Sequence, residues 1–304
     1  MKLVEMEVDP PPNICFNDDL ILDLIRHEDE GESEDCKCLI NKAWTVRSCT
    51  PLHNFSYAES DLRSYGLAFS NIIQKECSIK YVKCEFEVVS ELAFSNKDNK
   101  SVKITVHSTV NGRRKALFES YLVSRNSSFK PRSLTRLPVF LYNGSLKVAL
   151  VVIAAIQFMF GGHMSEMKFS VNELLAFTVN HCWKPNAEKD DDSELDLVLD
   201  YELPVPENSN IEYSIESSRF KELFSRIIDQ PGDETSIMSS FHNDILHHFY
   251  NNYEMNLDFF NLSTINLKNH LKIARKGKIK CNNPSVLNTM LKYLTQNINE
   301  SHKI

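Results

Sequence analysis

The sequence has little of what would place it in a familiar enzyme class. It contains only 8 glycines and 11 prolines among 304 residues, which argues against a long disordered or low-complexity chain. It has no glycine-rich phosphate loop, no His-Glu-x-x-His pair and no Gly-x-Ser-x-Gly turn. The one glycine pair, Gly161-Gly162, is followed by His163 and has no phosphate-binding lysine. We therefore expect a protein that is not an enzyme.

Long apolar runs are also missing. The longest, residues 148–160, is interrupted by Gln157 and ends at Gly161, whereas a membrane-spanning helix needs about 20 apolar residues. We expect a buried helix there and no membrane partner. The N-terminus has no apolar signal core, so the 8 cysteines are expected to be reduced and mostly buried thiols.

Metal-ligating residues are present but poorly arranged. Cys36 and Cys38 would need two further paired ligands to hold zinc, and only His27 lies near them. We expect these two cysteines to be exposed thiols in a tail. The histidines between His242 and His248 share a helix with an apolar stripe, so we interpret them as its polar face. No metal and no cofactor is predicted.

The net charge of −7 is unevenly distributed. Residues 28–35 hold six acidic and no basic side chains, which gives −6, and residues 188–202 give −7 from eight acidic residues and Lys189. Removing both runs from the total leaves +6 on the rest of the chain. A mildly basic body can contact an anionic partner, although a dedicated DNA-binding domain is usually more basic.

Alternating apolar and polar residues predict an antiparallel sheet. Residues 81–89, 102–110 and 117–123 alternate with a period of two, and Asn111-Gly112 is a strong hairpin signal between the last two. Such alternation indicates a sheet with one face on a core and the other open to solvent or a partner. We predict an α+β fold in which helices pack on a curved, largely antiparallel sheet.

Further elements follow from periodicity and from capping residues. Helices are expected from Ser60, as N-cap, to residue 73, then over 146–160, 171–183 and 234–250, and from Pro284 onward. Another helix is expected with Ser217 or Ser218 as its cap and Pro231-Gly232 at its end. Strands are expected over 44–48, 137–142, 195–203, 255–262, 265–273 and 278–281, with 261–264 joining the two penultimate strands. Residues 1–38 are predicted to be a poorly ordered acidic tail and 39–304 a single unit, with a subdivision near 184–194 left open.

Two basic clusters are candidates for contact with the DNA backbone. Lysines on an edge strand often protect it from unwanted pairing, and cations at turn tips can neutralise phosphates without reading sequence. Both interpretations stay open. The candidate residues are Arg113, Arg114 and Lys115 after the hairpin, and Lys268, Lys272, Arg275, Lys276, Lys278 and Lys280 near the last strands.

The same late strands are candidates for a partner interface. If one of them lies at a sheet edge, its unpaired backbone groups can accept a strand from another chain. The candidate interface residues are Leu267, Leu271, Ile273, Ile279 and Lys280.

Four segments, in this order, resemble the centromere protein L (CENP-L) family. The first joins a Trp44-Thr45 strand to the Thr50-Pro51-Leu52 turn and Phe55-Ser56-Tyr57. The others are residues 134–144 (Leu-Thr-Arg-Leu-Pro-Val-Phe-Leu-Tyr-Asn-Gly), Pro-Gly-Asp-Glu at 231–234 with its helix, and Gly-Lys-Ile-Lys at 277–280 with the terminal helix. The resemblance covers about residues 39–295.

The resemblance implies a nuclear scaffold subunit of the inner kinetochore, within the constitutive centromere-associated network. It implies an obligate partner, CENP-N, joined through the C-terminal β regions into one continuous sheet. It also implies support of attachment to CENP-A chromatin, of kinetochore assembly and of chromosome segregation. Two alternatives stay open: a DNA-binding pincer-like protein of related fold acting outside the kinetochore, and an enzyme without a recognisable motif.

Overall fold

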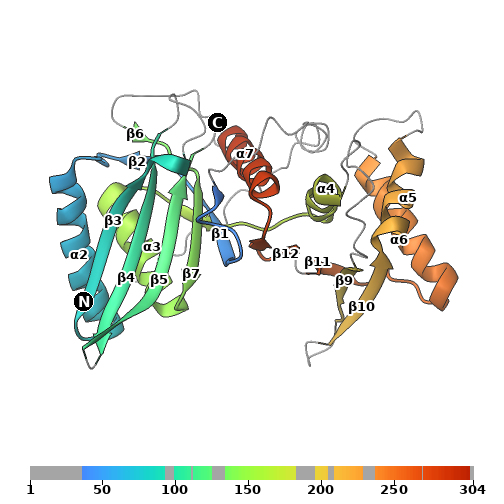
Figure 1. Ribbon diagram of the computed structural model, residues 1–304, viewed down its shortest axis with the longest axis horizontal. Helices are drawn as coiled ribbons and strands as arrows, with labels where there is room; N and C mark the ends of the chain where they lie inside the picture. The colour runs from blue at the N-terminus through green and yellow to red at the C-terminus, as the bar shows by residue number, and fades with distance from the viewer. Residues whose placement is uncertain are drawn as a thin grey trace.

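One large sheet organises the molecule (Figure 1). The computed structural model describes residues 36–92, 99–110, 112–124, 134–182, 196–204, 209–228, 237–268 and 270–301. These residues form six helices and an 11-stranded sheet in which every strand pair is antiparallel. The predicted α+β class is confirmed.

The elements have the following bounds. The strands are β1 (Ala43–Cys49), β2 (Leu52–His53), β3 (Val82–Val89), β4 (Ser101–Val110), β5 (Arg113–Val123), β6 (Leu134–Thr135), β7 (Val139–Gly144), β8 (Met164–Glu166), β9 (Asp196–Glu202), β10 (Asn210–Glu216), β11 (Asn261–Leu267), β12 (Leu271–Ala274) and β13 (Lys278–Cys281). The helices are α2 (Glu59–Cys77), α3 (Leu146–Phe160), α4 (Val171–Cys182), α5 (Ser217–Ile228), α6 (Ile237–Tyr253) and α7 (Pro284–Ser301), with a short 3₁₀ turn, η2 (Ser90–Leu92).

The strand order shows which strands lie at the ends of the sheet. It runs β10–β9–β11–β12–β13–β1–β7–β5–β4–β3, with β8 also paired to β1 and with β2 and β6 forming a separate pair. The order mixes early and late strands, because β1 lies between β13 and β7. The two ends of the sheet are therefore β10 and β3.

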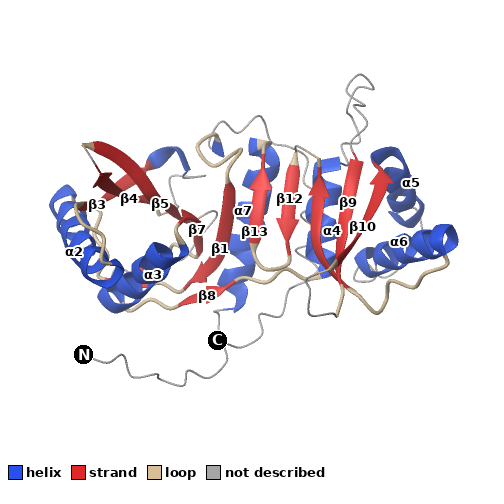
Figure 2. Cartoon of the chain, turned by 90° about the horizontal axis from the view of Figure 1, so that it is seen from below, coloured by secondary structure: helices blue, strands red, loops and turns tan. Residues whose placement is uncertain are grey.

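Helices cover opposite faces of the two halves of the sheet. Neighbouring residues of a strand point to opposite faces, and in β1 Trp44 belongs to the core beneath α4 and α7. Thr45 points the other way and pairs with Tyr142, which belongs to the core beneath α2 and α3. Figure 2 shows the result: α2 and α3 lie in front of the sheet at one end, and α4 and α7 lie behind it at the other.

A buried carboxylate joins α4 to α7. Ser170 and Glu173 form a reciprocal capping box at the start of α4, with Ser170 N–H donating to Glu173 Oε2 at 2.7 Å and Glu173 N–H donating to Ser170 Oγ at 3.2 Å. The other carboxylate oxygen accepts the Tyr293 hydroxyl of α7 at 2.9 Å, and Asn297 donates to that hydroxyl at 3.2 Å. The fully buried Glu173 therefore fixes the spacing of the two helices over the sheet.

Most predicted elements are confirmed, and some boundaries are wrong. The helix predicted from Ser60 begins at Glu59 with Ala58 as N-cap, and Ala58 makes no side-chain cap. The late strand pair turns at residues 268–270, where His270 N–H donates to Leu267 O, and not at 261–264. Pro284 does open the last helix, with Asn283 Oδ1 accepting the N–H of Ser285 and Val286.

Burial corrects two further expectations. Cys36 is fully buried and Cys38 half-buried, so they are not exposed tail thiols. Burial raises the pKa of the Cys49 thiol and of the Cys84 thiol to about 12 each, so the expectation of buried cysteines is met there. Helix α3 is not buried on all sides, because Phe158 is 89% exposed.

Replacing Glu173 tests the link between α4 and α7. In Glu173→Ala the Ser170 N–H and the Tyr293 hydroxyl lose buried acceptors, so we expect the free energy of unfolding to fall by about 2–4 kcal/mol. Chemical denaturation measures this loss. The control is Glu59→Ala, which removes an exposed carboxylate paired with Arg63 and should cost at most about 0.5 kcal/mol. Equal losses in the two variants would contradict the assigned role of Glu173.

Candidate functional site: an open sheet edge and a basic sheet face

The late strands predicted as a partner edge lie inside the sheet. β12 pairs with β11 on one side and with β13 on the other, and β13 also pairs with β1. Their backbone groups are therefore already used, so another chain cannot add a strand there. The prediction of an edge at these strands is wrong because β1, from the start of the chain, fills the position beside β13.

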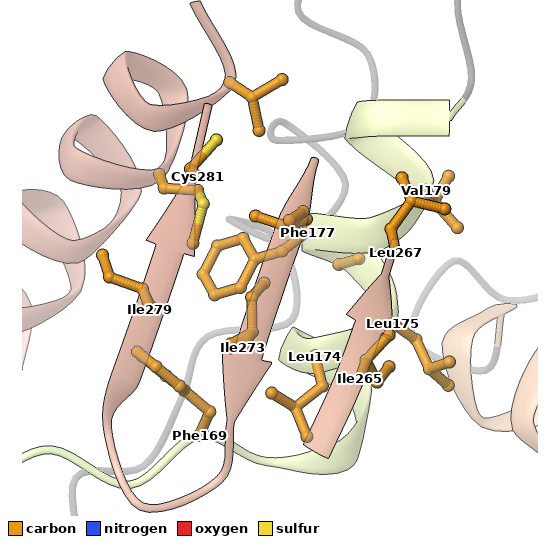
Figure 3. Packing of buried hydrophobic residues seen from close by; sticks show 14 of the residues in the cluster. Phe169, Leu174, Leu175, Phe177, Val179, Ile265, Leu267, Ile273, Ile279 and Cys281 are labelled. Atoms are coloured by element: carbon orange, nitrogen blue, oxygen red, sulfur yellow. The ribbon is translucent and has the colours of Figure 1, made fainter. Parts of the chain in front are cut away.

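The apolar interface candidates are core residues. Leu271 is 2% exposed, and Leu267, Ile273 and Ile279 are buried to the same degree. Figure 3 shows Phe177 of α4 beside Ile273 of β12, with Ile279 on the neighbouring strand β13. Lys280, the fifth candidate, points to the opposite face and is exposed.

The edge strand β10 offers unpaired backbone groups. Leu203 N–H donates to Ser209 O at 3.0 Å, so these two residues form a hydrogen-bonded pair of the β9–β10 ladder. In an antiparallel ladder such pairs alternate with pairs whose backbone groups point away from each other. Tyr213 and the other odd-numbered residues of β10 therefore direct their backbone groups toward β9. Asn210, Glu212, Ser214 and Glu216 direct theirs away from the sheet. Among the described residues no partner meets the outward groups of Asn210, Glu212 and Ser214, whereas the Glu216 carbonyl stands at the start of α5 and accepts the first hydrogen bond of that helix.

The opposite edge, β3, is covered by a helix. Thr109 N–H donates to Tyr81 O, so the odd-numbered residues of β3 direct their backbone N–H and C=O groups toward β4. The N–H and C=O of Cys84, an even-numbered residue, therefore point away from the sheet. Cys84 N–H donates to Ser70 Oγ of α2 at 2.8 Å. Its carbonyl oxygen lies so close to α2 that a Cβ added to Gly66 would stand 2.6 Å from it. A glycine at this position lets α2 lie directly against the edge and block it.

The two faces of β10 differ in chemistry. Glu212 and Glu216 lie exposed on the face that no helix covers, and Glu212 is directly opposite Asp200 of β9. Burial and the nearby Glu212 raise the pKa of the Asp200 carboxyl. On the other face Tyr213 is buried, and its hydroxyl hydrogen-bonds to His248 Nδ1 of α6.

Aromatic side chains of α6 continue the apolar face beyond β10. Tyr253 packs edge-on against Tyr213, with ring centroids 6.0 Å apart, yet it is 60% exposed. Tyr250, one turn earlier, is half exposed. Exposed large aromatics beside an open strand are typical of protein–protein contact surfaces.

Three lysines form a second feature, which we call the basic sheet face. Lys272, Lys278 and Lys280 project from β12 and β13 on the side that no helix covers, as Figure 2 shows for these strands. Lys272 and Lys280 are register partners, and like charges directly opposite one another destabilise a strand pair. Among the described residues none of the three makes an ion pair.

The remaining basic candidates are spread out or already paired. Lys276 lies 3.6 Å from Glu202, and Arg275 donates to Asn261 at 3.1 Å. Arg114 pairs with Glu85. The β4–β5 hairpin with Arg113 and Lys115 lies away from β12 and β13, since β7 and β1 intervene in the sheet. Lys268 is exposed at the turn after β11. The two predicted clusters therefore do not form one surface.

The sequence contained a signal for β10 that our prediction missed. Ile211, Tyr213 and Ile215 alternate with polar residues, the pattern of a half-buried strand. The pattern is short and follows an acidic run, and no turn dipeptide marks its partner. Its position at a sheet end depends on pairing between distant segments.

Other kinds of site find no support in the part of the chain that the structure describes. It contains no group of three or more metal-ligating side chains. It also contains no helix with the length and apolar character needed to span a membrane.

Comparison with known proteins identifies the family. The family model described as centromere protein L matches residues 38–301, nearly the whole chain. A search of curated proteins finds no significant match. The residues matched include both the open edge and the basic sheet face. The chain therefore belongs to the centromere protein L family, whose members are structural subunits of the centromere-associated network at the kinetochore in the nucleus.

Proposed function

We propose that the chain is a non-enzymatic kinetochore scaffold that heterodimerises with CENP-N by accepting a strand from it at the edge of β10. The observation that carries the proposal is the row of outward backbone groups on β10, in a family of kinetochore subunits. Strand addition would extend the sheet across the two proteins. The pair would support attachment to CENP-A chromatin, kinetochore assembly and chromosome segregation.

The surroundings of β10 favour this edge over the other end of the sheet. At β3 the groups of Cys84 are occupied by α2, whereas Tyr253, which is exposed and packs against Tyr213, extends the contact area at β10. Burying such apolar surface contributes about 25 cal/mol per Å².

The side chains of β10 also define the chemistry of the added strand. Glu212 and Glu216 on one face favour basic cross-strand neighbours, and Tyr253 on the other favours apolar ones. The partner strand should therefore alternate basic and apolar residues.

A proline at Ser214 tests the edge. The Ser214 N–H points away from β9, so a proline removes an outward donor and places its ring in the path of an added strand without breaking the β9–β10 ladder. We expect Ser214→Pro to weaken CENP-N binding by at least about tenfold. Titration calorimetry with the C-terminal region of CENP-N measures it.

Ser214→Ala is the matched control for this test. It removes the same hydroxyl but keeps the N–H, and it should bind as the unmodified chain does. Both variants should keep their thermal unfolding midpoint within a few degrees. Equal CENP-N affinity of the two variants would place the interface away from β10.

We further propose a supporting contact between the basic sheet face and DNA phosphates. Lys272, Lys278 and Lys280 are exposed, project from one face and have no ion-pair partner among the described residues. Phosphates would relieve the repulsion between Lys272 and Lys280 without any base being read. Such binding by the chain alone would also be the basis of the alternative function, a DNA-binding protein outside the kinetochore.

Replacing the three lysines by alanine tests this contact. Each phosphate contact contributes about 0.9 to the slope of log affinity against log salt concentration, so we expect the triple variant to lower that slope by about 2–3. Fluorescence anisotropy of a random-sequence duplex at several salt concentrations measures it. The control variant replaces three exposed lysines elsewhere, Lys75, Lys80 and Lys168. An equal change of slope in both variants would contradict a specific role for the basic sheet face.

A further inference from the structure

None of the three lysines of the basic sheet face makes an ion pair among the described residues, although Asp200 of β9 lies on the same face and acts electrostatically on Lys272. Asn282 N–H donates to His270 O, so Lys272 and Lys280 occupy a hydrogen-bonded position of the β12–β13 ladder. Their Cα atoms at such a position lie about 5.5 Å apart. Lys278 projects from the same face two residues along β13. Three cations held this close favour an anionic occupant.

The chain itself carries a segment of complementary charge. Residues 28–35 contain six acidic side chains and no basic one, and they lie outside the described residues. They join the described body at Cys36, which is fully buried. Their point of attachment to the folded body is therefore fixed.

Cys36 packs in the core on the helix-covered face, and the chain runs from there into β1, beside the end of β13 that carries Lys280. Asn41 N–H donates to Cys281 O at 2.9 Å, and Ala43 is the register partner of Lys280. Lys272 is the second residue of β12 and lies opposite Lys280. Eight extended residues span about 26 Å, which is several times the 4.8 Å or so between neighbouring strands. The acidic run can therefore reach around the sheet end to the open face.

From this charge complementarity and this tether we propose that residues 28–35 bind the basic sheet face within the same chain. The acidic run would occupy Lys272, Lys278 and Lys280 and compete with any external polyanion for them. Its regulatory consequence, a lowered affinity for DNA phosphates, rests on the phosphate contact proposed above. The intramolecular contact itself does not depend on DNA.

The strength of the competition follows from the tether. A short tether gives an effective concentration of about 1 mM, so a segment with an intrinsic dissociation constant of about 0.1–1 mM lowers the affinity of a competitor about 2- to 10-fold. Both the contact and the competition are electrostatic, so they should weaken together as salt is raised.

Carbodiimide cross-linking of the full chain tests the contact directly. The reagent joins a carboxylate to a lysine amine only where the two are in contact, and mass spectrometry identifies the pair. We expect residues 28–35 to couple preferentially to Lys272, Lys278 and Lys280 in dilute solution. Equal coupling to the exposed Lys75, Lys80 and Lys168 would overturn the proposal.

Duplex DNA affinity tests the competition. Neutralising the run (Glu28→Gln, Asp29→Asn, Glu30→Gln, Glu32→Gln, Glu34→Gln, Asp35→Asn) should tighten binding about 2- to 10-fold at low salt. This gain in DNA affinity should vanish when Lys272, Lys278 and Lys280 are replaced by alanine. In a double-mutant cycle, the effect of neutralising the run depends on the lysines only if the two groups interact.

A second acidic run provides the matched control. Residues 188–194 contain five acidic side chains and one lysine, and neutralising those acids changes the net charge by a similar amount. An equal gain from that variant would overturn the competition, because it would reflect net charge alone. Cross-links to the three lysines in a chain with no DNA affinity would uphold the contact and overturn the phosphate function.

Discussion

The continuity of the sheet depends on the pairing of β1 with β13. Only three register pairs join them, from Ala43 with Lys280 to Thr45 with Lys278, yet they connect strands from the two ends of the chain. Val46 N–H extends the contact by donating to Gly277 O at 2.7 Å. Gly277 has a φ of +70°, and a Cβ there would lie 2.5 Å from Met167 O. A glycine is required at this joint for both reasons.

The joint also explains where the open surfaces lie. Because Trp44 and Thr45 point to different cores, the helices change faces at β1. The C-terminal half of the sheet therefore leaves one face without helices. In the C-terminal half that face combines the carboxylates of β9 and β10 with the lysines of β12 and β13. The surfaces that we assign to partners are open because the helices change from one face of the sheet to the other at β1.

Local sequence patterns predicted the helices and strands, whereas pairing between distant strands determined which strand edge is open. The alternation of β3, β4 and β5, the Asn-Gly hairpin and Pro284 at the start of α7 are properties of neighbouring residues, and they were predictable. The pairing of β1 with β13 joins residues 235 positions apart, as in the pair Trp44 and Ile279. No local pattern indicates such a contact. The prediction consequently placed Leu271 and Ile273 at an edge, although both are core residues.

The cover that α2 gives to β3 has a consequence for assembly. A sheet with two open ends can add strands at both, so copies or partners could join head to tail into a fibre of unlimited length. Ser70 and Gly66 close one end by occupying the outward groups of Cys84. Growth by strand addition then stops after a single step. A complex formed by strand addition at β10, as proposed above, would therefore gain a single added strand, because α2 covers the other end of the sheet.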